Sequence, residues 1–562
     1  MFQIPLDLLR RQIREAAGAL GRGWDLLRHK GPGQIQFWFI ALIVGTLAGT
    51  AALLFRLAIE WLQATVYAVP DLSQLHSWAG GLPWYMVLAI PTAGGLVVGT
   101  ILHVFTPDGR VRSVADVIEG AALRDGRVEK KAGLASALCS WITLSTGGST
   151  GREGPVVHLA AMISSWVSNL MRADGITGRD LLGCAVAAAV SASFNAPIAG
   201  ALFALEVILR HFALHAFAPI VVASAAGTVI NRLAFGDVTE FRLSTHSELE
   251  FYLELPAFLL LGLVCGVVAV VLMRAIFWAD DLGTQLQRAM RLPHWLRPAV
   301  AGVMLGGLAI GFPHVIGVGY ETTSRALLGD IALHDALIFA VLKVTAVSIT
   351  MAGRMGGGVF SPSLMVGALT GLSFGMIATG LFPTVSGAQT LYALAGMGAV
   401  AAAVLGAPIS TTLIVFELTG DWQTGLAVMV SVSMSTALAS RLVDRSFFLT
   451  QLEHRNIHLA AGPQAYLLAM FRVQGVMRRD AIPDADWADA RQHMDQGLFL
   501  STQATLEQAL PLFDRSQALF LPVVHLPPED TAPPKLVGVL YHVDALKAYN
   551  RALAATAEEE HS

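Results

Sequence analysis

The residues best suited to chemistry lie in one glycine-rich stretch, Gly147-Gly-Ser-Thr-Gly-Arg-Glu-Gly-Pro-Val-Val-His158. Its glycines and proline predict an extended, open backbone followed by a helix that begins at Pro155. The first N–H groups of a helix have no partner within it and attract anions. Glu153 places a carboxylate where an anion would otherwise bind. The surrounding sequence is strongly apolar, and an ionisable residue inside a membrane is a candidate functional residue.

Other interpretations fit parts of this stretch. A carboxylate at Glu153 also fits a helix cap or a pair with Arg152, and His158 is expected to be a helix residue with a satisfied hydrogen bond. Gly147-Gly-Ser149-Thr-Gly151 fits the Gly-x-Ser-x-Gly pattern of serine hydrolases, which needs a strand before the serine. The neighbouring segments are apolar and helical, so an intramembrane serine hydrolase is a distant alternative and we expect no enzyme. No Lys-Ser or Lys-Thr follows the glycines, which excludes a phosphate-binding P-loop.

The composition requires lipid to solvate most of the chain. Of its 562 residues, 54% are hydrophobic and 14% are charged, and the mean hydropathy is +0.59. Soluble domains carry about 25% charged residues. The formal net charge of -4 does not suggest nucleic-acid binding. Cys139, Cys184 and Cys265 lie in apolar runs, which predicts buried thiols without a disulfide framework or metal site, and no cofactor is expected.

Two kinds of apolar segment follow one another along the chain. Segments long enough to span the hydrocarbon core, which takes about 20 residues, lie near 37–62, 84–105, 217–234, 256–278, 297–312, 333–352, 363–381 and 424–442. Shorter pieces interrupted by glycine and proline lie near 132–146, 155–170, 180–194, 197–210, 390–404 and 408–419. Broken helices at membrane depth are tolerated where they are buried in protein or line a cavity. The predicted fold class is an all-α polytopic membrane protein, as in transporters and channels.

The chain also repeats itself. Phe194-Asn-Ala-Pro-Ile-Ala-Gly-Ala-Leu-Phe-Ala-Leu-Glu206 resembles Leu405-Gly-Ala-Pro-Ile-Ser-Thr-Thr-Leu-Ile-Val-Phe-Glu417, with Ala-Pro-Ile and the closing glutamate at matched positions. This predicts two related halves, about 37–235 and 250–445, with the substrate site at their interface. Both closing glutamates are expected to be hydrogen-bond acceptors at buried helix ends.

Three ordered motifs carry a family resemblance. Gly151-Arg-Glu-Gly-Pro155 resembles the signature of the CLC family of chloride channels and chloride/proton exchangers, in its bacterial ClcB-like branch. Gly356-Gly-Gly-Val-Phe-Ser-Pro362 is similar to the family's Gly-x-Phe-x-Pro segment, and the two Ala-Pro repeat helices resemble its paired buried helices. The resemblance covers about 35–455. It implies two inverted halves in each subunit, an anion pathway in each subunit, and a homodimer.

The resemblance also implies the residues of the anion site. Backbone amides at Val359 and Phe360 would coordinate the central anion, together with a serine and a tyrosine hydroxyl. Glu153 would be the gate, occupying an anion position when deprotonated and swinging away when protonated. This agrees with electrostatics, because a carboxylate and a chloride cannot comfortably share one low-dielectric site. The expected anion-binding residues are Ser113, Arg152, Gly154, Val359, Phe360 and Phe448.

Departures from the family pattern bear on the mechanism. Ser113 retains the serine, but Arg112-Ser-Val-Ala-Asp116 lacks the usual glycines and proline. Phe448 replaces the tyrosine, so we expect weaker chloride binding. Val207 stands where exchangers usually carry a second glutamate, and a valine cannot relay a proton. We therefore expect a passive voltage- or pH-gated chloride channel. A chloride/proton antiporter is the alternative, and fluoride or nitrate are alternative anions.

The ends of the chain carry further expectations. Residues 470–555 predict a small α/β domain of β-α-β-β-α order that resembles one CBS domain, with an insertion near 481–497. Nucleotide-binding CBS units carry a hydroxyl residue three positions before an aspartate. Here that position is Tyr541, so adenine-nucleotide binding is doubtful and a dimer clamp is preferred. The basic segment 1–34 predicts a cytoplasmic N-terminus, and we expect both termini on the cytoplasmic side of a bacterial inner membrane.

Overall fold

The computed structural model describes residues 33–173, 175–212, 214–236, 254–383, 386–457, 459, 468, 471–480, 482–525 and 535–561. The chain forms two compact units that divide between Arg455 and Asn456. The basic segment predicted over 1–34 lies almost entirely outside the described residues, as do the two Pro-Pro pairs of the tail.

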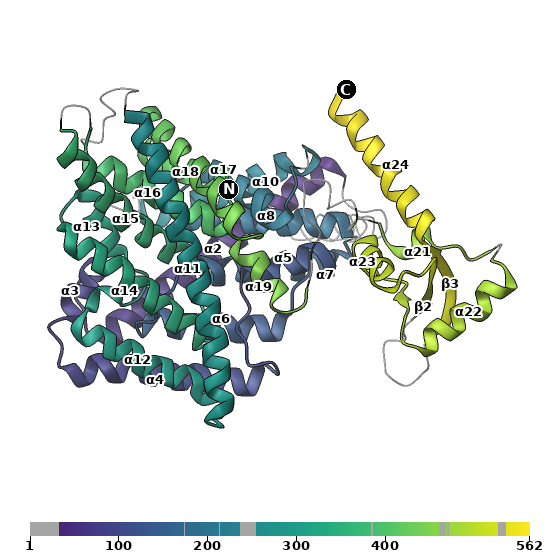
Figure 1. Ribbon diagram of the computed structural model, residues 1–562, viewed down its shortest axis with the longest axis horizontal. Helices are drawn as coiled ribbons and strands as arrows, with labels where there is room; N and C mark the ends of the chain where they lie inside the picture. The colour runs from purple at the N-terminus through teal and green to yellow at the C-terminus, as the bar shows by residue number, and fades with distance from the viewer. Residues whose placement is uncertain are drawn as a thin grey trace, which may run out of the picture. The chain divides into compact units, whose positions relative to one another are not determined.

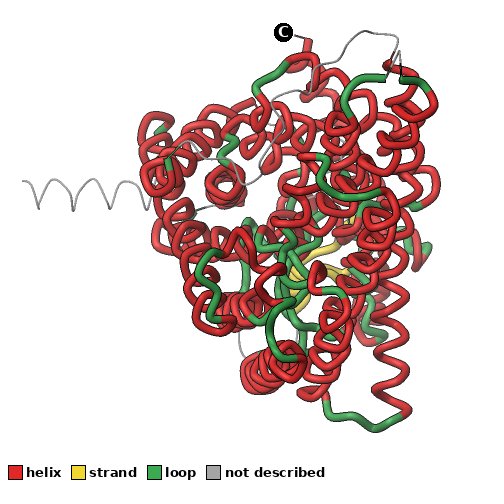
Figure 2. Tube along the Cα trace, turned by 90° about the vertical axis from the view of Figure 1, so that its left-hand side faces the viewer, coloured by secondary structure: helices red, strands yellow, loops and turns green. Residues whose placement is uncertain are grey.

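The first unit is built from helices, as the red tube in Figure 2 shows. Two glycine-rich strands of backbone, described below, are the main exception. The first half of the unit contains α2 (Gln34–Tyr67), η1 (Leu72–Gln74), α3 (Leu75–Ala79), α4 (Trp84–Phe105), α5 (Val114–Leu123), α6 (Lys130–Ser145), α7 (Glu153–Met171), α8 (Gly175–Phe194), α9 (Pro197–Phe203), η2 (Ala204–Leu209) and α10 (Leu214–Phe235). The second half contains α11 (Leu255–Ala289), η4 (His294–Leu296), α12 (Arg297–Gly311), η5 (Pro313–Val315), α13 (Tyr320–Leu328), α14 (Leu333–Ala352), α15 (Phe360–Leu381), α16 (Gln389–Leu405), α17 (Pro408–Thr419), α18 (Trp422–Leu442) and α19 (Phe447–Glu453).

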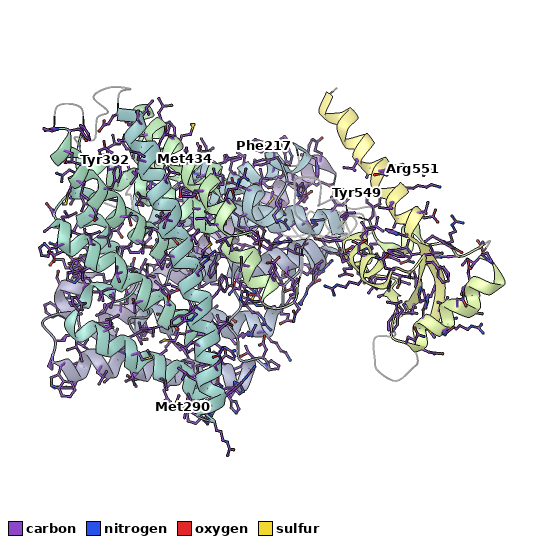
Figure 3. All side chains as sticks on the ribbon, in the orientation of Figure 1. Phe217, Met290, Tyr392, Met434, Tyr549 and Arg551 are labelled. Atoms are coloured by element: carbon purple, nitrogen blue, oxygen red, sulfur yellow. The ribbon has the colours of Figure 1, made fainter. Side chains whose placement is uncertain are left out.

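The long apolar segments are long helices in the structure. Within the described residues, 7 helices are long and apolar enough to cross a membrane: α2, α4, α10, α11, α14, α15 and the segment Thr424–Glu453 that contains α18 and α19. The longest, α11, ends beside Met290, labelled in Figure 3. Large apolar side chains on these helices face outward, as Phe39 and Val341 do. Such side chains suit contact with lipid.

One predicted span is shorter than expected. The segment 297–312 forms α12, which has 15 residues and is too short to cross the hydrocarbon core upright. Pro298 lies in its first turn and Pro313 follows its end, and both positions restrict a helix to the residues between them. The helix instead packs along α4, with Gly95 and Gly302 allowing close approach.

The short, interrupted pieces are helices buried in protein, as predicted. They are α6, α7, α8, α9 with η2, α16 and α17, and α8 and α16 are buried along most of their length. The predicted start of α7 at Pro155 is two residues late, because α7 begins at Glu153. Proline at the third helical position is tolerated, since the N–H groups of the first turn have no intrahelical partner to lose. Glu153 therefore belongs to the first turn of the helix.

The repeat is visible as a pair of helices that cap each other. The Glu206 carboxylate accepts hydrogen bonds from Ile409 N (2.9 Å) and Ser410 N (2.8 Å) at the start of α17. In return, Glu417 accepts from Ile198 N (2.9 Å) and Ala199 N (2.8 Å) at the start of α9. Both glutamates are hydrogen-bond acceptors at helix ends, as expected, and the exchange relates the two halves of the unit.

The second unit has the β-α-β-β-α order predicted for it. Its strands β1 (Leu500–Ser501), β2 (Phe520–His525) and β3 (Lys535–Tyr541) form a sheet in which β1 and β2 are parallel and β2 and β3 antiparallel. The predicted insertion contains α22, which packs on β2. The remaining described helices are α21 (Val473–Val476), α22 (Asp484–Asp495), α23 (Leu506–Ser516) and α24 (His542–His561). Figure 1 labels these elements.

Candidate functional site

Two glycine-rich segments, far apart in the sequence, meet and are hydrogen-bonded to each other. Gly151 N donates to Gly358 O at 2.7 Å, and Gly358 N donates to Gly151 O at 2.7 Å. Thr150 Oγ1 donates to the same Gly358 oxygen at 2.9 Å. A side chain at Gly154 would press against the Gly358 backbone, so glycine is needed for this close approach. The pairing joins the motif before α7 to the motif before α15.

This pairing brings two helix N-termini to one place. The helix α7 begins at Glu153 and α15 begins at Phe360, each directly after its paired glycine segment. Free N–H groups and the helix dipole make each N-terminus favourable for negative charge. Two converging N-termini in a buried setting form a region that favours an anion, as the sequence predicts for Val359 and Phe360.

Glu153 lies at the centre of this region. Its side chain is buried, and Oε1 accepts a hydrogen bond from Ser361 Oγ at the start of α15. No hydrogen-bond partner for Oε2 occurs among the described residues. The carboxylate thus lies against the second helix N-terminus rather than simply capping its own helix. The position matches that expected for a gate that occupies an anion position.

The walls of this region are aromatic and apolar. Val359 and Phe360 are buried, and the Phe360 ring lies 4.8 Å from the Phe194 ring and 6.3 Å from the Phe203 ring, centroid to centroid. Arg152 is also buried, and its guanidinium donates to Ser193 O at 3.3 Å. Its charge lies over the Tyr320 ring, 5.3 Å from the centroid. Water is largely displaced from such a setting, which strengthens any interaction with a charge.

The other predicted anion residues, Ser113 and Phe448, lie where α5 faces α19. Ser113 precedes α5, and its hydroxyl is 3.4 Å from Gln451 Oε1 on α19. Phe448 is buried in the first turn of α19. The helix α5 also packs against α7, which begins with Glu153. The structure therefore places Ser113 and Phe448 in neighbouring elements of one helix group.

Sequence reasoning missed two side chains of this region and misjudged a third. Ser361 follows the predicted Val359-Phe360 pair and contacts the gate carboxylate. Asp116 was seen only as part of a departure from the family pattern, although it accepts a hydrogen bond from Ser113 N at 2.7 Å. The satisfied hydrogen bond expected at His158 is wrong for the described residues, where neither ring nitrogen has a partner. The ring packs against Gly133 and Met162, apolar neighbours that a helix pattern does not reveal.

Val207 lies inside a short π-helical turn, η2, and is buried. The same turn carries Glu206, whose carboxylate is fully engaged by the start of α17. A π-turn rotates the side chains that follow it relative to an α-helix and often marks a functional position. The position where a second glutamate would lie is thus apolar and enclosed.

The tail places its candidate nucleotide residues in contact with one another. Tyr541 Oη donates to Asp486 Oδ2 at 2.5 Å, and burial together with this hydrogen bond raises the pKa of Tyr541 to about 12. The Asp544 carboxylate forms two hydrogen bonds with Arg478, at 2.6 and 3.0 Å, which lower its pKa. The insertion helix α22 supplies Asp486, so it lies over the position where a ligand hydroxyl would be needed.

Comparisons with known proteins agree with this architecture. A ClcB-like protein of Ralstonia nicotianae is 31% identical over 396 residues, covering 70% of this chain and 91% of the relative. The H(+)/Cl(-) exchange transporter ClcA of Vibrio campbellii is 27% identical, covering 76% of this chain and 91% of that protein. The solved structure of a slow cyanobacterial Cl-/H+ antiporter has a TM-score of 0.65 at 21% identity, covering 75% of this chain and 98% of that one. A eukaryotic CLC transporter gives 0.62 at 19% identity, with 90% and 98% covered.

The family model described as voltage gated chloride channel matches residues 94–440, which include both glycine motifs and both repeat helices. The fold, the paired broken helices and the relatives identify a multi-pass membrane protein. The chain belongs to the voltage-gated chloride channel, or CLC, family.

Proposed function

We propose that this protein transports chloride along a pathway that Glu153 gates. The observation that carries the proposal is the buried Glu153 carboxylate, which contacts the first turn of α15 where two helix N-termini converge. A tethered carboxylate in that position excludes a free anion, because two negative charges repel strongly in a low-dielectric site. Protonation removes the charge and releases the position to chloride.

Passive conduction is the form of transport that we favour. Tight exchange needs a group that takes a proton from the second side of the membrane, and the usual position for it is the buried Val207. A valine has no ionisable group. Its neighbour Glu206 is held by two backbone N–H groups of α17, which stabilise its charged form as a structural acceptor.

Purified protein in chloride-loaded liposomes tests both parts of the proposal. Valinomycin with potassium clamps the voltage while chloride efflux and external pH are recorded together. Chloride efflux without stoichiometric proton movement is the expected result and supports a passive conductor. The absence of chloride flux, with fluoride or nitrate flux in its place, would contradict the choice of anion.

Proton-coupled exchange is the second candidate function. It is favoured by relatives such as the Vibrio ClcA proteins, which are named as H(+)/Cl(-) exchange transporters. In the same liposomes, proton uptake in fixed ratio to chloride efflux supports this candidate and contradicts passive conduction. A proton route would then have to use a group other than Val207.

Phe448→Tyr is expected to bind chloride about tenfold more tightly, since a hydrogen bond to a charged group contributes about 1.5 kcal/mol or more. The substitution adds one hydroxyl in the first turn of α19. Isothermal titration with chloride in detergent measures the change. Phe447→Tyr is the matched control, because Phe447 stacks on Phe277 of α11 instead and should leave the affinity unchanged. Equal affinities of the wild type and Phe448→Tyr would remove Phe448 from the anion site.

The assembly that we propose is a homodimer in a bacterial inner membrane, with both termini in the cytoplasm. Exposed apolar side chains on the paired repeat helices and α10, including Ile198, Ile409 and Phe217, support a protein or lipid contact on that face. The tail is proposed to be a CBS-like unit that pairs with its copy. Its engaged Tyr541 and Asp544 side chains support a structural clamp rather than an adenine-nucleotide site.

A further inference from the structure

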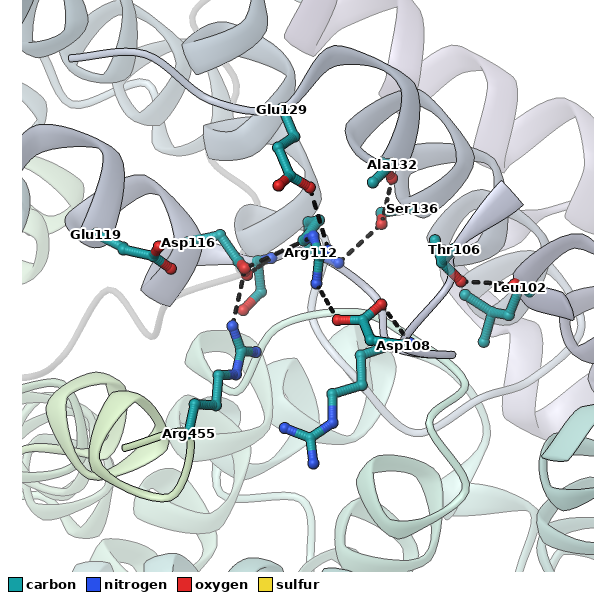
Figure 4. Close-up of polar contacts among 12 residues, drawn as sticks. Leu102, Thr106, Asp108, Arg112, Asp116, Glu119, Glu129, Ala132, Ser136 and Arg455 are labelled. Carbon is teal, nitrogen blue, oxygen red and sulfur yellow. Dashed lines mark hydrogen bonds and ion pairs between the residues drawn. The ribbon is translucent and has the colours of Figure 1, made fainter. Parts of the chain in front are cut away.

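A polar cluster joins α5 to α19. Asp116 accepts from Arg455 at 2.8 Å as well as from Ser113 N, so its carboxylate links the two helices (Figure 4). The Ser113 hydroxyl adds a second approach, 3.4 Å from Gln451 Oε1. Asp116 and Arg455 are largely buried, with side chains 11% and 14% exposed. We name this set of four residues, Ser113, Asp116, Gln451 and Arg455, the α5–α19 latch.

The latch lies on the same face as the proposed anion residue of α19. Phe448, Gln451 and Arg455 are spaced by three and four residues, which places them on one side of a helix. Two of these three side chains contact α5 directly. The anion residues proposed on the facing elements, Ser113 and Phe448, therefore lie at a junction that the latch holds together.

The two sides of the junction are held differently. The start of α5 is anchored by Arg112, whose backbone N donates to Ser136 of α6 at 2.8 Å. The Arg112 side chain pairs with Asp108 at 2.6 Å and with Glu129 at 3.1 Å (Figure 4). By contrast, α19 has seven residues and rests on α11 through ring stacking, with Phe447 and His454 against Phe277. Stacked rings can slide at small cost, whereas an ion pair fixes one arrangement.

We infer that the α5–α19 latch is a second gate, in which the Asp116–Arg455 ion pair holds the Ser113–Phe448 end of the pathway closed until α19 moves away from α5. This rests on the proposed function. It assigns Asp116 and Arg455 as positioning residues that control the width of the junction without binding the anion. The gate is separate from Glu153, which lies at the start of α7.

A reversible cross-link tests the latch. Asp116→Cys and Arg455→Cys are combined, joined in detergent by a short bifunctional thiosulfonate, and verified by mass spectrometry before reconstitution. The native cysteines are buried and lie elsewhere in the fold. Cross-linking is expected to reduce chloride flux by more than about tenfold, because a conformational step then becomes limiting, and dithiothreitol restores it. Undiminished flux in the cross-linked protein overturns the latch.

The matched control is a pair that does not reach α5. Arg445 Nε and Glu453 Oε1 are 2.5 Å apart and tie the loop before α19 to its last turn. Arg445→Cys with Glu453→Cys, cross-linked in the same way, is expected to keep its flux. A block there as well would attribute the effect to α19 rigidity and contradict the latch. The absence of chloride flux in wild-type liposomes would instead refute the proposed function.

A second measurement applies if the cysteine variant does not transport when reduced. Asp116→Asn and Arg455→Gln each break the ion pair, so each is expected to raise chloride flux several-fold. The double variant is expected to match the singles, since residues that act through one contact are not additive. Additive changes, or lower flux in both singles, would show that the pair does not hold the pathway closed.

Discussion

Glu153→Gln is expected to give chloride flux that no longer responds to pH and that exceeds the wild-type flux at neutral pH. Glutamine keeps the shape of the side chain but cannot carry the negative charge. Two unit charges 4 Å apart repel by about 4 kcal/mol at an effective dielectric of 20, an effect large enough to empty a site. In the wild type, protonation removes this repulsion, so flux should rise as pH falls. Liposome efflux at a series of external pH values measures both features.

Glu417→Gln provides the control for this experiment. Glu417 is another carboxylate of the first unit, but it accepts from backbone N–H groups at the start of α9 and does not lie at the glycine pair. Its variant should keep the wild-type pH profile. If Glu153→Gln keeps that profile as well, Glu153 is not the gate, and the contact with Ser361 has only a structural role.

Much of the fold could be predicted because short local patterns specify it. The Ala-Pro-Ile and closing-glutamate repeat predicts two matching helices, and the structure shows them capping each other through Glu206 and Glu417. The order of strands and helices in the tail also follows from local patterns. Boundaries were less certain, since proline fits any position of a first helical turn, and α7 begins two residues before Pro155.

The site was predicted less completely, because contacts between distant segments have no local signal. The motifs containing Glu153 and Phe360 were found separately, but nothing in either predicts that Ser361 contacts the carboxylate. Asp116 and Arg455 are separated by 339 positions, and each looks like a solvated charge in its own segment. Only the replacement of glycine and proline around Ser113 indicated that this helix start differs from the family pattern.

Glu206→Ala is expected to destabilise the first unit by about 3 kcal/mol, the largest stability change that we predict. Its removal leaves Ile409 N–H and Ser410 N–H without their acceptor, and an unsatisfied buried donor costs about 1–3 kcal/mol. Glu417→Ala removes the matching bonds to Ile198 and Ala199 and should cost a similar amount. The repeat thus predicts paired effects from two residues far apart in the sequence.

Thermal unfolding in detergent at a fixed scan rate, followed by tryptophan fluorescence, measures these losses. Glu60→Ala is the control, because Glu60 pairs with Arg56 one helical turn away and is partly exposed, with a side chain 33% accessible. Such pairs contribute about 1 kcal/mol or less. Each repeat variant should therefore unfold at a clearly lower temperature than Glu60→Ala. Equal transitions for all three variants would mean that water replaces the lost carboxylates at the helix ends, and that the mutual caps do not join the two halves.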